Sequence, residues 1–147
     1  MGATGDDGPF LISTVDTIAP PGAFAAFAAT SRSLDADLTL AVAPPPADDE
    51  KPLLVRVSDR ANGFRVEALG AAAGAALATA GYYSVRASVL REAEGARRDQ
   101  VRALRLFLER LLARGYGLAA VPVAAGVDVD RPGDIRIAEA LLRQVGA

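Results

Sequence analysis

Apolar runs and amphipathic segments alternate along the first third of the chain. Residues 9–15 (PFLISTV) form an apolar run that ends at Asp16, the length and flanks of a buried strand. Residues 22–34 follow two prolines and place apolar side chains at helical spacing, which predicts a helix. Residues 36–43 (ADLTLAVA) predict a second buried strand. We therefore expect strand, helix, strand.

The middle of the chain combines loops with an antiparallel pair. Residues 44–52 mix prolines with charges and are predicted to form a loop. Residues 53–57 and 64–69 flank an Asn-Gly sequence, which predicts a β-hairpin. The Ala-rich stretch 70–79 has a helical composition, but its glycines and the TAGYYSV sequence favour a loop that runs into a strand.

The last third begins with the clearest helical pattern. Residues 99–114 place leucines on one face of a predicted helix. The arginine-rich residues 91–102, which overlap its start, can be either a solvated helix start or a patch that faces phosphate. Residues 117–123 predict a strand, and residues 131–145 a terminal helix with a proline in its first turn.

This order of elements predicts one α/β domain over residues 1–147, with residues 1–8 as a flexible N-terminus. Strands that alternate with helices imply a mixed, mostly parallel sheet with helices on both faces, and the hairpin is an insertion. The expected fold class is a partial Rossmann-like fold.

Composition narrows the chemistry. The chain has no cysteine and no histidine, which excludes disulfides, thiol nucleophiles and Ser/His pairs. A metal must therefore bind through oxygen ligands, which suits Mg²⁺. The net charge of −2 argues against nucleic acid as a partner. No membrane span or signal peptide is predicted, so we expect a cytoplasmic protein.

Three aspartates are the candidate metal ligands. Asp16 ends the first strand, and Asp128 and Asp130 lie between the last strand and the last helix. In open α/β sheets ligands bind beyond the carboxyl ends of strands, so these side chains can meet. Each has an alternative: Asp16 as a turn residue, Asp130 as the N-cap of the last helix, and Asp128 as a residue with no functional role. Gly81 can be a ligand contact or a strand irregularity.

The ordered segments FLISTVD, ATAGYYSV and VDVDRPGDIRIAEALL resemble the later part of the nucleotidyltransferase family that includes sugar-phosphate nucleotidyltransferases and molybdenum cofactor guanylyltransferases. The resemblance implies that Asp16 and Asp128 hold Mg²⁺ against nucleotide phosphates. It also implies that Gly81 contacts the acceptor through its backbone. In the last motif, Arg131 and Gly133 replace a threonine and a glutamate of the family pattern.

The family opens with a glycine-rich loop that grips the triphosphate, and no such loop is found in MGATGDDG. We therefore expect a truncated domain that binds NTP only when a partner or an N-terminal segment completes it. Completed in this way, it would transfer a nucleoside monophosphate from NTP to a phosphorylated acceptor, either a sugar phosphate or a molybdopterin-type cofactor. The alternative is a non-catalytic remnant that acts as a binding or oligomerisation module. In both cases a homodimer or a hetero-complex is expected.

Overall fold

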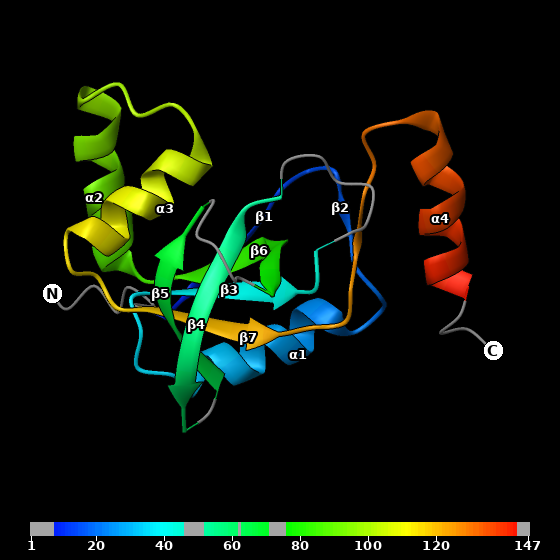
Figure 1. The fold of residues 1–147 in the computed structure, drawn as a ribbon, viewed down its shortest axis with the longest axis horizontal. Helices are drawn as coiled ribbons and strands as arrows, with labels where there is room; N and C mark the ends of the chain where they lie inside the picture. The colour runs from blue at the N-terminus through cyan, green and yellow to red at the C-terminus, as the bar shows by residue number, and fades with distance from the viewer. Residues whose placement is uncertain (1–7, 46–51, 62, 71–75, 144–147) are drawn as a thin grey trace, which may run out of the picture.

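The computed structural model describes residues 8–45, 52–61, 63–70 and 76–143. Strands and helices alternate irregularly along this chain (Figure 1). In chain order the elements are β1 (Phe10–Ser13), β2 (Thr17–Ile18), α1 (Ala23–Arg32), β3 (Leu38–Ala43), β4 (Leu54–Arg60), β5 (Gly63–Leu69), β6 (Leu77–Val85), α2 (Ala87–Arg98), α3 (Leu104–Ala113), β7 (Leu118–Pro122), β8 (Val127–Asp128) and α4 (Pro132–Arg143).

The main sheet is mixed, and the prediction of a mostly parallel sheet is wrong. Its strand order is β1-β6-β3-β7-β5-β4, and β3 and β7 are the parallel pair among the described strands. The other pairs are antiparallel. Strand β6 pairs antiparallel with β3, and β5 of the β4–β5 hairpin pairs antiparallel with β7. A further pairing of β4 with β6 closes five of these strands into a ring.

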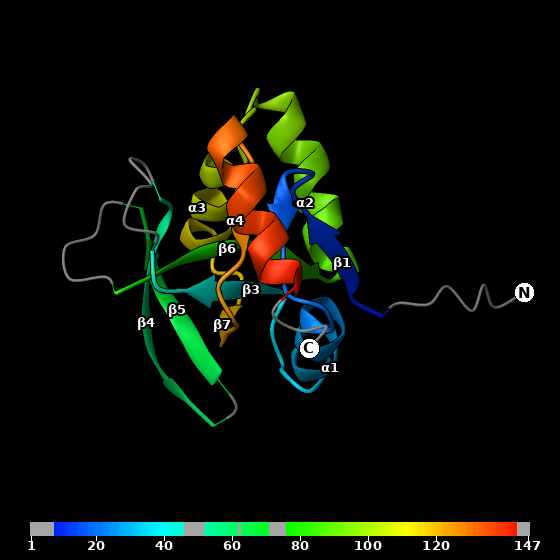
Figure 2. The same cartoon turned by 90° about the vertical axis from the view of Figure 1, so that its right-hand side faces the viewer.

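Helices cover both faces of the sheet, as predicted. On one face α2 and α3 bury Val89, Leu108 and Leu111 against the strands. On the other face α1 buries Phe27 beside Tyr82, whose ring it meets edge to face at 5.0 Å between centroids. Figure 2 shows α1 separated from α2 and α3 by the strands.

Two predictions for single elements are wrong. The helix predicted over residues 99–114 begins at Leu104, and α2 is a separate helix before it. Gln100 has a positive φ of 60°, which a helix cannot continue through. Strand β1 is not buried: Phe10, Leu11 and Ile12 are 46%, 45% and 43% exposed, because β1 lies at the edge of the sheet and, among the described strands, pairs with β6 alone.

The strand at 36–43, the hairpin, the strand at 117–123 and the helices at 22–34 and 131–145 agree with β3, β4–β5, β7, α1 and α4. Most of the loop predicted at 44–52, residues 1–7 of the flexible N-terminus and most of the Ala-rich loop lie outside the described residues. None of the described helices is both long enough and apolar enough to cross a bilayer.

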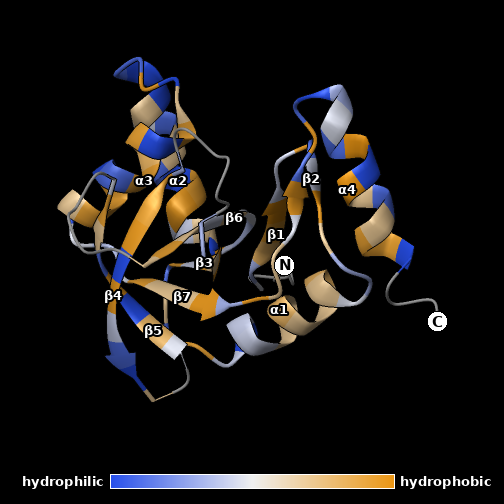
Figure 3. Cartoon of the chain, turned by 45° about the vertical axis from the view of Figure 1, so that its right-hand side comes forward, coloured by the Kyte–Doolittle hydropathy of each residue, from blue (hydrophilic) through white to orange (hydrophobic). Residues whose placement is uncertain are grey.

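A two-stranded ribbon of β2 and β8 stands apart from the main sheet. Its register pairs Thr17 with Asp128 and Ile18 with Val127. Helix α4 lies against this ribbon and carries hydrophobic and hydrophilic residues in alternation (Figure 3). The ribbon was not predicted, because a strand of two residues leaves no periodic signal.

Candidate functional site

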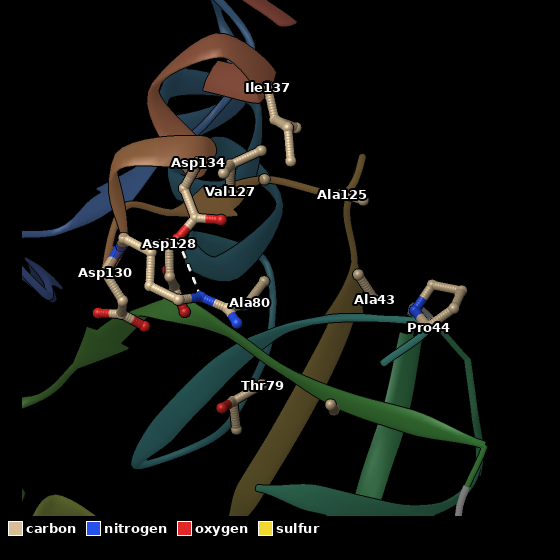
Figure 4. Close-up of a pocket in the computed structure, with 13 residues that line it drawn as sticks. Ala43, Pro44, Thr79, Ala80, Ala125, Val127, Asp128, Asp130, Asp134 and Ile137 are labelled. Atoms are coloured by element: carbon tan, nitrogen blue, oxygen red, sulfur yellow. Dashed lines mark hydrogen bonds and ion pairs between the residues drawn. The ribbon is translucent and has the colours of Figure 1, made fainter. Parts of the chain in front are cut away.

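A cavity of about 440 Å³ opens between the ends of the main sheet and the ribbon with its following helix, a volume that suits a small molecule (Figure 4). Small side chains form one wall and acidic side chains gather on the other. The lining residues are Ala43, Pro44, Ala78, Thr79 and Ala80 on the sheet side, and Ala125, Gly126, Val127, Asp128, Asp130, Arg131, Asp134 and Ile137 on the side of β8 and α4.

The β2–β8 ribbon brings the three predicted aspartates together. Asp16 directly precedes β2, Asp128 ends β8, and Asp130 follows two residues later. The backbone N–H of Val129 donates to the carbonyl oxygen of Asp16 at 2.9 Å, which extends the ribbon by one bond. Residues far apart in the sequence therefore lie close together: Asp128 and Asp130 line the cavity, and Asp16 lies beside Asp130 without lining it. The sequence predicts that all three can meet at the ends of strands, but β1, which precedes Asp16, is exposed and not buried as expected.

Threonine hydroxyls hold Asp128 in place. The hydroxyl of Thr17 donates to Oδ1 of Asp128 at 2.7 Å, and the hydroxyls of Thr14 and Thr17 lie 2.5 Å apart. Thr17 is buried, whereas Asp128 is exposed and keeps its Oδ2 for another partner. Sequence reasoning missed both threonines, although each lies in the STVDT segment beside Asp16.

Asp130 faces a concentration of negative charge. Partial removal from water raises the pKa of its carboxyl, and the charge of Asp16 and a hydrogen bond with Asp16 raise the pKa further. The charges of Asp128 and Asp134 act in the same direction. A cation placed between Asp16 and Asp130 would relieve this repulsion, and the same arrangement keeps a proton on Asp130 more readily than on an isolated aspartate.

Asp134 performs the capping role that was considered for Asp130. Helix α4 begins at Pro132, and Oδ2 of Asp134 accepts the backbone N–H groups of Asp130 at 3.1 Å and Arg131 at 2.9 Å. The N-cap interpretation of Asp130 is therefore wrong, because a carboxylate in the first turn reaches back to the donors that precede the helix. Nε of Arg131 lies 3.9 Å from the same oxygen. Asp134 was not selected from the sequence.

Gly81 lies behind the cavity wall. It has a φ of +88°, and a Cβ at this position would overlap the hydroxyl of Thr17 and lie 3.1 Å from that of Thr14. Its carbonyl oxygen accepts the backbone N–H of Thr14 at 2.9 Å. Its neighbours Thr79 and Ala80 line the cavity, and Gly81 itself does not. The geometry gives Gly81 a packing role, and its contact with an acceptor stays a prediction.

The donor set suits a metal that shares its coordination sphere with a substrate. Within the described ranges no three carboxylates are arranged to hold a metal ion by themselves. Mg²⁺ commonly takes one or two carboxylates and completes its octahedron with water and substrate phosphates. The adjacent carboxylates of Asp16 and Asp130, with the free oxygen of Asp128 nearby, fit that requirement, and Mg²⁺ remains a prediction.

Comparison by sequence finds no matching family model. No curated protein matches the chain either. Solved structures do match: the inositol-1-phosphate CTP transferase of T. maritima has a TM-score of 0.70 at 19% identity, over 91% of this chain and 55% of that one. A UDP-glucose pyrophosphorylase complexed with UDP-glucose has a TM-score of 0.71 at 14% identity, over 97% of this chain and 59% of that one.

A nucleoside-diphosphate-sugar pyrophosphorylase from Vibrio cholerae RC9 matches with a TM-score of 0.58 at 16% identity, over 93% of this chain and 57% of that one. The structural neighbours are thus sugar-phosphate nucleotidyltransferases, as the resemblance predicted, and the chain has their fold. It spans 55% to 59% of the length of these three proteins.

Proposed function

We propose that this chain is the acceptor-side part of a nucleotidyltransferase, which transfers a nucleoside monophosphate from NTP to a phosphorylated acceptor when a triphosphate-binding segment completes it. The observation that carries the proposal is the meeting of Asp16 with Asp130 beside Asp128, at a cavity of about 440 Å³. The three similar structures support it, since they are an inositol-1-phosphate CTP transferase, a UDP-glucose pyrophosphorylase and a nucleoside-diphosphate-sugar pyrophosphorylase.

In this proposal the role of each charged residue follows from the sign of its charge. Bound Mg²⁺ would neutralise phosphate charge at Asp16, Asp128 and Asp130. Thr17 keeps Oδ1 of Asp128 occupied and so directs its other oxygen outward. Arg131 is the cation among the described residues that line the cavity, and we assign to it the phosphate of the acceptor. Asp134 fixes the backbone of Asp130 and Arg131 by accepting hydrogen bonds from their N–H groups.

Calorimetric titration with each of the four NTPs, and with glucose 1-phosphate and inositol 1-phosphate, in the presence of Mg²⁺ tests this proposal. We expect Mg²⁺-dependent binding of a phosphorylated ligand that Asp16→Asn and Asp128→Asn each weaken about tenfold or more. Arg131→Ser should weaken the acceptor and leave Mg²⁺ dependence in place.

Asp59→Asn is the matched control, because Asp59 is an exposed carboxylate on β4, away from the cavity. It removes one negative charge and should leave binding unchanged. Folded protein that binds none of these ligands, or variants that all weaken binding equally with the control, would contradict the proposal.

A second candidate function is a binding or oligomerisation module, which the exposed edge of β1 favours. Phe10, Leu11 and Ile12 are all more than 40% exposed on a strand whose second edge pairs with no other described strand, and such edges pair readily with other strands. Light scattering should then show a homodimer or, with a partner, a hetero-complex. Leu11→Lys should give a monomer, whereas Val15→Lys, at a fully exposed position outside β1, should not.

A further inference from the structure

A second cavity lies between α2 and α3, and arginines dominate its lining. Its volume is about 440 Å³, comparable with that of the acidic cavity. Its lining residues are Arg91, Glu92, Gly95, Arg98, Asp99, Arg110 and Arg114. Four guanidinium groups face two carboxylates there. In Figure 1 the two helices lie at the opposite end of the molecule from α4 and the ribbon, so this cavity is separate from the candidate site.

Charge is unevenly distributed along the sequence. Residues 87–114 contain seven arginines and four acidic residues, a formal charge of +3. The remaining nine basic and fourteen acidic residues carry −5, although the net charge of the whole chain is only −2. The α2–α3 end therefore attracts anions that the aspartates of the other end repel.

A partly buried ion-pair network positions one arginine at the floor of the cavity. Arg110 donates through Nε to Oε1 of Glu92 at 3.0 Å and through Nη1 to Oδ2 of Asp99 at 2.7 Å. The hydroxyl of Tyr116 donates to the other oxygen of Glu92 at 3.1 Å. The side chains of Arg110 and Glu92 are 18% and 12% exposed, so the network is held by packing and by charge.

The network leaves donors directed at the empty space. Nη2 of Arg110 makes no hydrogen bond with any described residue, and a Cβ at Gly95 would lie 3.4 Å from it. The missing side chain of Gly95 thus keeps the floor of the cavity open. Arg91 and Arg98 lie on the same face of α2 as Gly95 and line the same cavity, and the charge of Arg98 also acts on Asp99.

We propose that the α2–α3 cavity binds a small anion with two or more phosphate groups. Two exposed guanidinium groups on the rim and one fixed guanidinium nitrogen on the floor match the paired oxygens of phosphates better than a single carboxylate. The proposal does not depend on the function proposed for the acidic cavity.

Calorimetry with tripolyphosphate, pyrophosphate, orthophosphate and ATP, all in EDTA, tests this site. Chelation of Mg²⁺ prevents the acidic cavity from holding these anions, so the two sites are distinguished. We expect binding to strengthen with the number of phosphates. The single variants Arg91→Ser and Arg98→Ser should each weaken binding about tenfold, and the double variant about a hundredfold. Equal binding of ATP and tripolyphosphate identifies the polyphosphate as the ligand, and tighter binding of ATP identifies a nucleotide.

Two further variants distinguish binding in the cavity from a general effect of positive charge. Gly95→Leu fills the cavity without a change in charge and should abolish binding, whereas Arg97→Ser removes one exposed arginine of α2 outside the cavity and should leave it intact. Circular dichroism checks that each variant is folded. The proposal is overturned if folded wild-type protein does not bind tripolyphosphate, or if Arg97→Ser weakens binding as much as Arg98→Ser.

Discussion

The hydroxyl of Thr17 and the carboxylate of Asp128 form a 2.7 Å hydrogen bond that joins two segments more than 100 residues apart. The donor is buried and the acceptor is exposed, so the bond fixes the direction of a charged group at the surface of the cavity. Its loss should affect both stability and the position of Asp128.

Thr17→Val removes this hydroxyl and keeps the shape of the side chain. A hydrogen bond to a charged group contributes about 2 kcal/mol, so the free energy of unfolding should fall by about that amount in urea titrations. Thr30→Val is the control, since Thr30 is exposed and its hydroxyl bonds only within α1. An equal loss of stability in the two variants would show that the Thr17–Asp128 bond adds nothing.

Gly81→Ala should destabilise the protein by about 3 kcal/mol, because it adds a clash with Thr17 to an unfavourable positive φ. Gly22→Ala separates the two effects: Gly22 has a φ of +81°, but a Cβ there has no atom within 4 Å. Its cost should be only about 1 kcal/mol. Thermal and urea unfolding of both variants measure the difference in stability. Equal losses of stability would disprove the close approach of Gly81 to the Thr17 hydroxyl.

Glu92 should make the stability depend on acid pH. Its hydrogen bond with Arg110 is the largest of the effects that hold its pKa below the usual 4.5. The folded protein therefore binds this proton more weakly than the unfolded chain, so the stabilisation is present above pH 4.5 and is lost as the pH falls through the lowered pKa.

Glu92→Gln should lower the melting temperature at neutral pH and show a smaller difference from wild type at about pH 3. Glu94→Gln, at an exposed position on the same helix, should follow the wild-type curve at every pH. A Glu92→Gln curve parallel to that of the wild type would contradict the assigned pKa shift.

Tyr82→Phe should leave the protein as stable as the wild type or more stable. The Tyr82 hydroxyl is buried and has no hydrogen-bond partner among the described residues, so its removal abolishes a desolvation cost of about 1 kcal/mol. Tyr116→Phe, which loses the bond to Glu92, should be less stable than the wild type. Urea titrations compare the two, and a large loss of stability for Tyr82→Phe would reveal an unseen partner.

The sequence predicted the elements that bury a continuous apolar face. The apolar run at 36–43 became β3 and the spaced apolar residues of 22–34 became α1, since burial and periodicity are visible in the residues themselves. The order of strands was not visible: β6 pairs antiparallel with β3 although a loop and a hairpin separate them. Register between distant strands depends on contacts that no local pattern contains.

The aspartates of the candidate site could be predicted from the sequence, but the residues that hold them in position could not. Asp16, Asp128 and Asp130 could be selected because acidic residues beside strands are conspicuous. Thr17 and Asp134 could not, because a hydroxyl or a first-turn carboxylate gains its role only from what lies opposite it. Likewise, Gly95 attracts no attention in the sequence, because its space beside Arg110 is apparent only in three dimensions.

The parallel pairing of β3 with β7 has a consequence for how the protein is made. Leu38 is matched with Leu118, so β7, a central strand of the sheet, is translated only after β3, β4, β5 and β6. Until then β3 and β5 lack the neighbour that joins them, and their apolar residues stay accessible to other chains. Folding of the sheet is therefore expected to wait until β7 has been synthesised and to be slower than in helical proteins of this size.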